Sequence, residues 1–210
     1  MAILELGVLA SGTGSNLQAI LDAIANGTLD ARVRIVISNV PGAQALQRAT
    51  EAGVPVATIP HRQFASRREF DTTIAEALDR AGAEWVILAG FMRVLTPEFL
   101  KKFHRRVLNI HPALLPSFPG VHAQKQAFDH GVKVAGCTVH FVDQGVDSGP
   151  IVAQHAVPVL TDDTADVLAE RILEQEHLLY VEVLRWLAAN RVKWLDIEPG
   201  GRSKITVLPQ

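Results

Sequence analysis

Short apolar runs rich in valine, isoleucine and leucine alternate with longer stretches of helical period along most of this chain, and no other feature constrains its fold as much. Such repeated strand-helix-strand units predict an α/β fold with a mainly parallel central sheet flanked by helices. We expect the first five strands to be buried on both faces. The predicted strands are Leu4–Ala10, Val33–Ser38, Val54–Ile59, Trp85–Ala89, Val107–Ile110, Val134–Val142 and Ile151–Val157.

Capping residues mark the predicted helices between these strands. Asn16–Asn26 places four apolar side chains on one face, and Gly27 ends it. Thr96 followed by proline predicts the start of a helix that runs through Phe103. A long last helix is predicted from about Thr164 to Asn190. Other helices are expected to end at Gly53, Gly82 and Gly131.

The composition favours a single cytoplasmic domain. The 210 residues are 48% hydrophobic, which is enough for one large core. The formal charge is −2 and no basic stripe is present, so we expect no nucleic-acid surface. No run approaches the length that spans a bilayer, no signal peptide opens the chain, and Cys137 is the only cysteine. We therefore expect no membrane association and a reducing compartment.

The turn after the first predicted strand is suited to an anion. In parallel sheets, ligands gather at the carboxyl ends of the strands. There Ser11-Gly12-Thr13-Gly14-Ser15-Asn16 leads into a helix, whose N-terminus and backbone N–H groups can bind a phosphate. Leu17 stands where the dinucleotide fingerprint needs its third glycine. The alternative is an ordinary turn whose glycines only relieve strain.

Two polar segments follow later strands. Asn109 and His111 lie two apart, so they project from the same side of a strand and could stabilise an oxyanion or act in acid-base catalysis. They could equally satisfy loop carbonyls. In the loop 143–149, Asp143 and Asp147 could bind a cation, cap a turn, or orient and charge a nearby histidine. An aspartate beside His111 would raise its pKa and hold it protonated near neutral pH. Histidine spacing indicates no metal site.

Other residues have two interpretations each. Met92, Arg93, Val94 and Leu95 after the fourth strand could line a site for a flat heteroaromatic ring, although core packing would also explain Val94 and Leu95. Arg67 or the adjacent Arg68 could bind a carboxylate, or form a solvated helix start. Glu176 is most often a surface charge at such a position, and Cys137 is expected to be a buried small hydrophobe.

Taken together, these segments resemble the folate-dependent formyltransferases, in particular the branch that acts on glycinamide ribonucleotide. The resemblance covers the chain to about residue 190. It rests on the stretches 9–19 (LASGTGSNLQA), 88–95 (LAGFMRVL), 108–116 (LNIHPALLP), 118–120 (FPG), 138–142 (TVHFV), 147–150 (DSGP) and 175–177 (QEH). It implies a Rossmann-like fold in one formyltransferase domain, with a phosphate-binding half at about 1–105, a catalytic and folate-binding half at about 106–190, and a tail at 191–210.

The resemblance also implies an activity: transfer of the formyl group of 10-formyltetrahydrofolate to the amine of glycinamide ribonucleotide in de novo purine biosynthesis, by a monomer or homodimer without a metal. Asn109, His111 and Asp147 would be catalytic. The ribonucleotide would bind Gly12, Thr13, Gly14, Ser15, Asn16 and Glu176. The folate would bind Arg67, Met92, Arg93, Val94, Leu95, Asn109, Asp143, Gln144, Gly145, Val146 and Asp147.

Three alternatives remain: a hydrolase of 10-formyltetrahydrofolate, a formyltransferase of aminoacyl-tRNA, and a nucleotide-binding module without catalysis. The first two carry an additional domain in the related proteins, and the length of this chain is expected to leave no room for one. In the third, Asn109 and His111 would be structural.

Overall fold

The computed structural model describes residues 3–195 and 203–209, and the chain forms two compact units, residues 1–109 and 110–210. The predicted halves meet at about residue 105. The seven main strands form one sheet in the order β3-β2-β1-β4-β5-β6-β7. The predicted fold class, an α/β fold with a mainly parallel central sheet, is confirmed.

In the first unit, five strands carry the parallel part of the sheet. Each hydrogen-bonded pair from β3 to β5 is parallel. The side chains of β1 and β4 are almost wholly buried, as expected for strands covered on both faces. The strands are β1 (Leu4–Ala10), β2 (Ala31–Ser38), β3 (Val56–Thr58), β4 (Trp85–Leu88) and β5 (Val107–His111), of which β5 runs into the second unit.

The prediction for the third strand is wrong in length and burial. We expected Val54–Ile59 to be buried on both faces, but β3 has only three residues and Val56 is 42% exposed. The physical reason is position: β3 is the last strand at its end of the sheet, and it pairs only with Val36–Ser38 of β2. A strand with a single neighbour is covered less completely.

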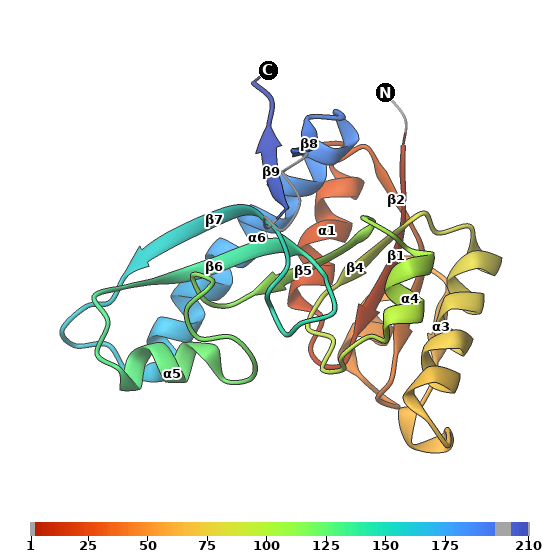
Figure 1. Ribbon diagram of the computed structural model, residues 1–210, viewed down its shortest axis with the longest axis horizontal. Coiled ribbons are helices and arrows are strands. Elements are labelled where there is room, and N and C mark those ends of the chain that lie inside the picture. Colours follow the sequence, from red (N-terminus) through yellow and green to blue (C-terminus); the bar gives the residue numbers. More distant parts are fainter. Residues whose placement is uncertain (1–2, 196–202, 210) are drawn as a thin grey trace. The chain divides into compact units, whose positions relative to one another are not determined.

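The helices of the first unit begin and end where local signals require. Ser66 caps α3 by accepting a hydrogen bond from the Glu69 N–H, and Gly82 ends that helix with a φ of 75°. Figure 1 shows α3 beside α4, and the two helices are in contact. The helices are α1 (Ser15–Ala25), α2 (Gln44–Glu51), α3 (Arg67–Ala81) and α4 (Pro97–Lys102), with a 3-10 turn, η1, at His61–Gln63.

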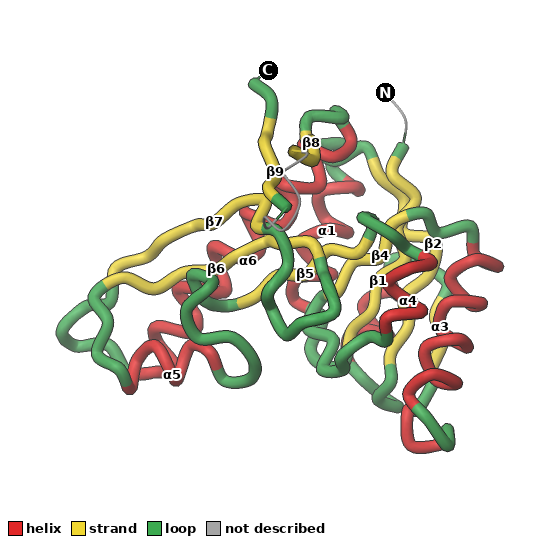
Figure 2. Tube along the Cα trace, viewed as in Figure 1, coloured by secondary structure: helices red, strands yellow, loops and turns green. Residues whose placement is uncertain are grey.

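The second unit is built on an antiparallel pair of strands and one long helix. Strand β6 is buried along nearly its whole length and pairs with β7, and α6 packs against both strands. Figure 2 shows the loop that joins β6 to β7. Thr164, the predicted start of the last helix, caps α6, which begins one residue later at Ala165. The elements are α5 (Ala123–Asp129), β6 (Val134–Phe141), β7 (Ile151–Pro158) and α6 (Ala165–Ala188).

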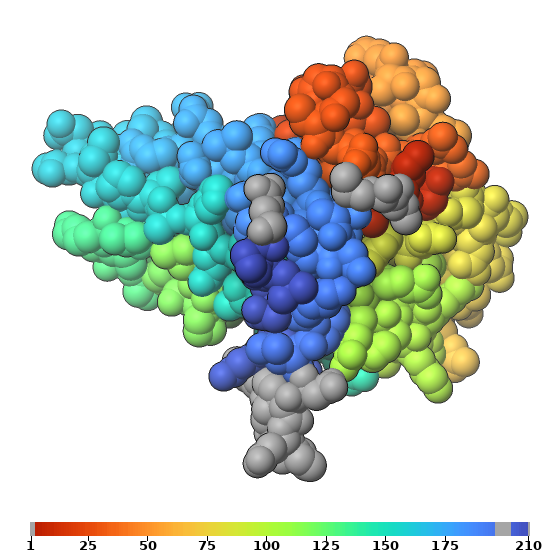
Figure 3. Space-filling model, turned by 90° about the horizontal axis from the view of Figure 1, so that it is seen from above, coloured from red at the N-terminus to blue at the C-terminus, as the bar shows by residue number. Residues whose placement is uncertain are grey.

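The tail after residue 190 contains two strands that the sequence did not indicate. Strands β8 (Val192–Leu195) and β9 (Lys204–Val207) pair in antiparallel fashion, and the Leu208 N–H donates to the Arg191 carbonyl at 2.9 Å. Trp194 packs on Phe141 of β6 with a ring separation of 4.7 Å. Figure 3 shows the dark blue residues of β9 on the surface. Within the described ranges, no helix has the length and apolar character that a membrane crossing requires.

Candidate active site

The glycine turn ends directly at the N-terminus of α1. Gly14 is the residue before the helix and has a φ of 72°, a conformation that glycine adopts without strain. Gly14 has no side chain to cap the helix, and the first turn of α1 contains no acidic residue. No acidic side chain of that turn therefore offsets the positive end of the helix dipole.

Arg48 of α2 adds a positive charge beside this turn, and our sequence interpretation missed it. Its Nε donates to the Thr13 carbonyl at 2.9 Å, and its Nη1 donates to Gln18 Oε1 at 3.1 Å. Thirty-five residues separate Arg48 from Thr13, so no local motif contains both.

The segment Met92–Leu95 exposes two apolar side chains. Met92 is 68% exposed and Val94 is 48% exposed, whereas Leu95 is buried. Core packing therefore explains Leu95 but not Val94. Arg67 and Arg68 begin α3, and Arg68 lies 4.0 Å from Glu98 in an exposed ion pair. Arg67 is exposed as well, and its charge acts on the carboxyl group of Asp71.

His111 ends β5 and lies between two acceptors of the second unit. Its Nε2 is 2.8 Å from the Phe118 carbonyl oxygen, and its Nδ1 is 3.3 Å from Asp147 Oδ2. A carbonyl oxygen only accepts, so Nε2 carries a hydrogen. Only the doubly protonated ring can then donate to Asp147 as well. Asn109 lies two residues earlier on β5 and is half-buried.

Asp147 has a constrained backbone and three polar neighbours. Its φ of 50° is unusual for a residue other than glycine, although aspartate and asparagine tolerate it. Oδ2 accepts the Gly120 N–H at 2.8 Å, and Oδ1 lies 3.6 Å from His140 Nε2. His140 is a second histidine on the carboxylate that the sequence interpretation did not include as a site residue.

Burial reverses the pKa that we predicted for His111. Desolvation lowers the pKa below its ordinary value; the Phe118 carbonyl and the Asp147 carboxylate oppose this change without overcoming it. The prediction of a histidine held protonated near neutral pH is therefore wrong for the free protein. For Asp147, burial raises the pKa, but the hydrogen bonds from His140 and Gly120 and the two histidine charges outweigh it, so the pKa is lowered.

The rest of the loop 143–149 is held by its first residue. Asp143 Oδ1 accepts hydrogen bonds from the Gly145 N–H at 3.0 Å and from Ser148 Oγ at 2.7 Å. This is the turn-capping role considered above for such an aspartate. Gln144, Gly145 and Val146 are exposed, and Val146 is 55% exposed.

Glu176 and Cys137 lie in the core of the second unit. Glu176 is only 5% exposed on α6, so the surface-charge alternative is wrong. Cys137 is fully buried, as expected; burial and the charge of Glu176 raise the pKa of its thiol to about 12. The described residues contain no group of three or more histidine, cysteine or acidic side chains that could hold a metal ion.

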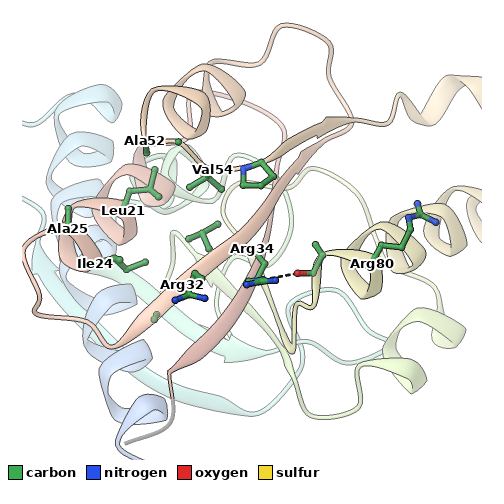
Figure 4. A pocket seen from close by; sticks show the side chains of 13 residues that line it. Leu21, Ile24, Ala25, Arg32, Arg34, Ala52, Val54 and Arg80 are labelled. Atoms are coloured by element: carbon green, nitrogen blue, oxygen red, sulfur yellow. Dashed lines mark hydrogen bonds between the residues drawn. The ribbon is translucent and has the colours of Figure 1, made fainter.

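A cavity of about 800 Å³ lies elsewhere in the first unit. Figure 4 shows Leu21 and Ile24 of α1 facing Arg32 and Arg34 at the start of β2. Arg34 donates to the Ala81 carbonyl at 2.7 Å. The cavity is at the amino end of β2, whereas the glycine turn follows the carboxyl end of β1, and none of the predicted site residues lines it.

Comparison with known proteins assigns the chain to a family. Residues 4–184 match the family described as formyl transferase, and the chain belongs to that family. It is 41% identical over 199 residues to phosphoribosylglycinamide formyltransferase of Escherichia coli, which covers 92% of this chain and 94% of that protein. Glycinamide ribonucleotide transformylase 1 from Symbiobacterium toebii superimposes with a TM-score of 0.93 at 49% identity, over 99% of this chain and 95% of that one.

A longer class of relatives contains this domain as one part. The chain is 50% identical over 185 residues to the trifunctional purine biosynthetic protein adenosine-3 of Drosophila melanogaster, which covers 87% of this chain but only 14% of that protein. The resemblance to the formyltransferases that act on glycinamide ribonucleotide is confirmed by these relatives.

Proposed function

We propose that this chain transfers the formyl group of 10-formyltetrahydrofolate to the amine of glycinamide ribonucleotide in de novo purine biosynthesis. The observation that carries the proposal is the contact between His111 and Asp147, 3.3 Å apart, in a chain that aligns almost whole with phosphoribosylglycinamide formyltransferase of E. coli. The names of the relatives support formyl transfer to phosphoribosylglycinamide. That the formyl group comes from 10-formyltetrahydrofolate is implied by the family resemblance.

The reaction needs a nucleophile, an oxyanion stabiliser and a path for one proton. The neutral amine attacks the formyl carbon and forms a carbon–nitrogen bond, which gives a tetrahedral intermediate. The bond from that carbon to folate N10 then breaks, and the amine proton passes to N10. Tetrahydrofolate and the formylated ribonucleotide are the products, and no covalent formyl-enzyme is required.

His111 would change its partner during this reaction. In the free protein its Nε2 donates to the Phe118 carbonyl, so an oxyanion has to replace that carbonyl as the acceptor. The negative charge of the intermediate then favours the imidazolium form, which Asp147 stabilises from the other ring nitrogen. Asn109 would donate its amide to the same oxyanion, and Asp147 would help the proton transfer through water.

Binding roles follow the same proposal. The ribonucleotide phosphate would bind at Gly12–Asn16 with the charge of Arg48 nearby, and Glu176 would contact the remainder of that substrate. The pterin would lie against Met92–Leu95 and the loop Asp143–Asp147. Arg67 would bind the glutamate end of the folate, since Arg68 is paired with Glu98.

One assay separates this proposal from its alternatives. Loss of 10-formyltetrahydrofolate is followed with and without glycinamide ribonucleotide. Transfer requires the amine substrate, a hydrolase consumes the donor without it, and a binding module consumes nothing. Consumption that is independent of glycinamide ribonucleotide would overturn the proposal.

Replacement of His111 tests the catalytic assignment. We expect His111→Ala to lower kcat by about 10²- to 10⁴-fold, the usual contribution of a positioned acid-base group. Binding of the folate, measured by equilibrium titration, should change little because the predicted folate contacts lie on other residues. Retention of wild-type kcat would eliminate the role assigned to His111.

A further inference from the structure

The segment Met92–Leu95 is anchored at both ends by side chains from distant parts of the first unit. At its start, the Met92 N–H donates to Ser11 Oγ at 2.8 Å. Immediately after its end, the Thr96 N–H donates to Asp71 Oδ2 at 2.6 Å. Ser11 follows β1 and Asp71 lies in α3, so the two anchors come from separate elements.

The first anchor has a fixed direction because Ser11 has only one hydroxyl hydrogen. Ser11 Oγ donates that hydrogen to Asn39 Oδ1 at 2.6 Å, which leaves its lone pairs for the Met92 N–H. Asn39 is 5% exposed, and its Nδ2 contacts His61 Nδ1 at 3.1 Å. Hydrogen bonds that link His61, Asn39 and Ser11 therefore orient Ser11 Oγ, which accepts the Met92 N–H.

The second anchor is a buried carboxylate. Asp71 is 2% exposed, and its Oδ1 has no hydrogen-bond partner within the described part of the chain. Burial raises the pKa of Asp71, while the hydrogen bond from Thr96 and the charges of Arg67 and Arg93 oppose that rise. A carboxyl group in this position is costly to bury, so packing alone does not explain it.

Burial varies along residues 91–95, with the two end residues buried and two residues between them exposed. Phe91 and Leu95 are 8% and 5% exposed, whereas Met92 and Val94 are 68% and 48% exposed. The anchored backbone thus presents two apolar side chains to the outside in one conformation. A rigid apolar surface of this kind suits a flat ring, because little conformational entropy is lost when the ring binds.

From this geometry we infer that Ser11 and Asp71 are positioning residues that hold Met92–Leu95 in place for the ring system of the formyl donor. This inference rests on the proposed function. It also predicts a difference between the anchors. Ser11 begins the glycine turn, and its N–H donates to the Gly90 carbonyl at 3.0 Å, so Ser11 joins the segments proposed for both substrates. The hydrogen bond that Asp71 accepts comes from Thr96, directly after the segment proposed for the donor.

The test uses Asp71→Ala, Asp71→Asn and a matched control, Glu76→Gln, which removes an exposed carboxylate from the same helix. Amide hydrogen exchange is measured residue by residue on the free proteins. In Asp71→Ala we expect the Thr96 amide to exchange about tenfold to hundredfold faster, the factor for losing a hydrogen bond to a charged acceptor. Asp71→Asn keeps an acceptor and should show a smaller increase; Glu76→Gln should show none.

The second readout is the affinity for each substrate. In Asp71→Ala we expect the dissociation constant of a non-reactive folate analogue to rise on the order of tenfold, with that of glycinamide ribonucleotide unchanged. Ser11→Ala should weaken both and speed exchange at Met92. Faster Thr96 exchange with unchanged folate affinity would overturn the inference, as would unchanged exchange. If the wild-type chain binds no folate analogue, the proposed function fails. The exchange data are independent of folate and still show whether Asp71 anchors the Thr96 amide.

Discussion

Replacement of Gly14 by alanine tests whether the turn before α1 has the backbone described above. Gly14 has a φ of 72°, in the left-handed region that an L side chain occupies at a cost. A Cβ atom built at this position lies 2.7 Å from both Cα and Cβ of Ala45 in α2. Real Cβ atoms do not approach backbone atoms so closely, so the turn or α2 has to move.

The cost has two parts. The left-handed conformation costs about 1–2 kcal/mol for a residue with a Cβ. Insertion of a methyl group against a packed backbone costs about 1–3 kcal/mol. Their sum, about 2–5 kcal/mol, is a large part of the roughly 5–15 kcal/mol by which a domain is usually stable.

Urea unfolding of the ligand-free protein measures this cost, and Gly12→Ala is the matched control. A Cβ at Gly12 meets nothing within 4 Å, and no left-handed φ constrains this residue. We expect Gly12→Ala to unfold within about 0.5 kcal/mol of the wild-type chain. A loss below about 1 kcal/mol in Gly14→Ala, or equal losses in both variants, would refute the packing argument.

Three further predictions concern the second unit. Asp147→Asn tolerates the φ of 50° and can still accept the Gly120 N–H, so it should fold normally but turn over about tenfold to hundredfold more slowly; unchanged turnover would contradict the role of its charge. Because burial lowers the pKa of His111 from 6.5, the unfolded chain takes up this proton first as the pH falls, so the free energy of unfolding should decrease from about pH 7 to pH 5. His111→Gln should make that decrease shallower, and an equal slope in urea titrations would argue against it. Finally, with a thiol pKa of about 12, Cys137 should resist a disulfide reagent at about pH 8 until urea unfolds the chain; rapid native reaction would show that the thiol is accessible.

Much of the fold follows from local pattern. The run at β4 is apolar throughout and those at β1 and β5 are mostly apolar, as expected where both faces of a sheet are covered, and such runs are visible without knowledge of the neighbouring strands. Helix ends depend on single residues, so Gly82 and Thr164 predicted boundaries of α3 and α6. The exposure of β3 was missed because strand order, which no local pattern records, places it at the edge.

The amino-acid sequence alone determined which chemical groups the site contains. Glycines before a helix, and an asparagine and histidine two apart on a strand, can be recognised from spacing because backbone geometry fixes the direction of near neighbours. Only the tertiary structure decided which other groups contact them. Arg48 lies beside Thr13, His140 shares the carboxylate of Asp147, and Asp71 holds Thr96. It also decided the direction of the His111 pKa shift, because desolvation depends on everything that covers the ring and outweighs the one neighbour that the sequence suggested.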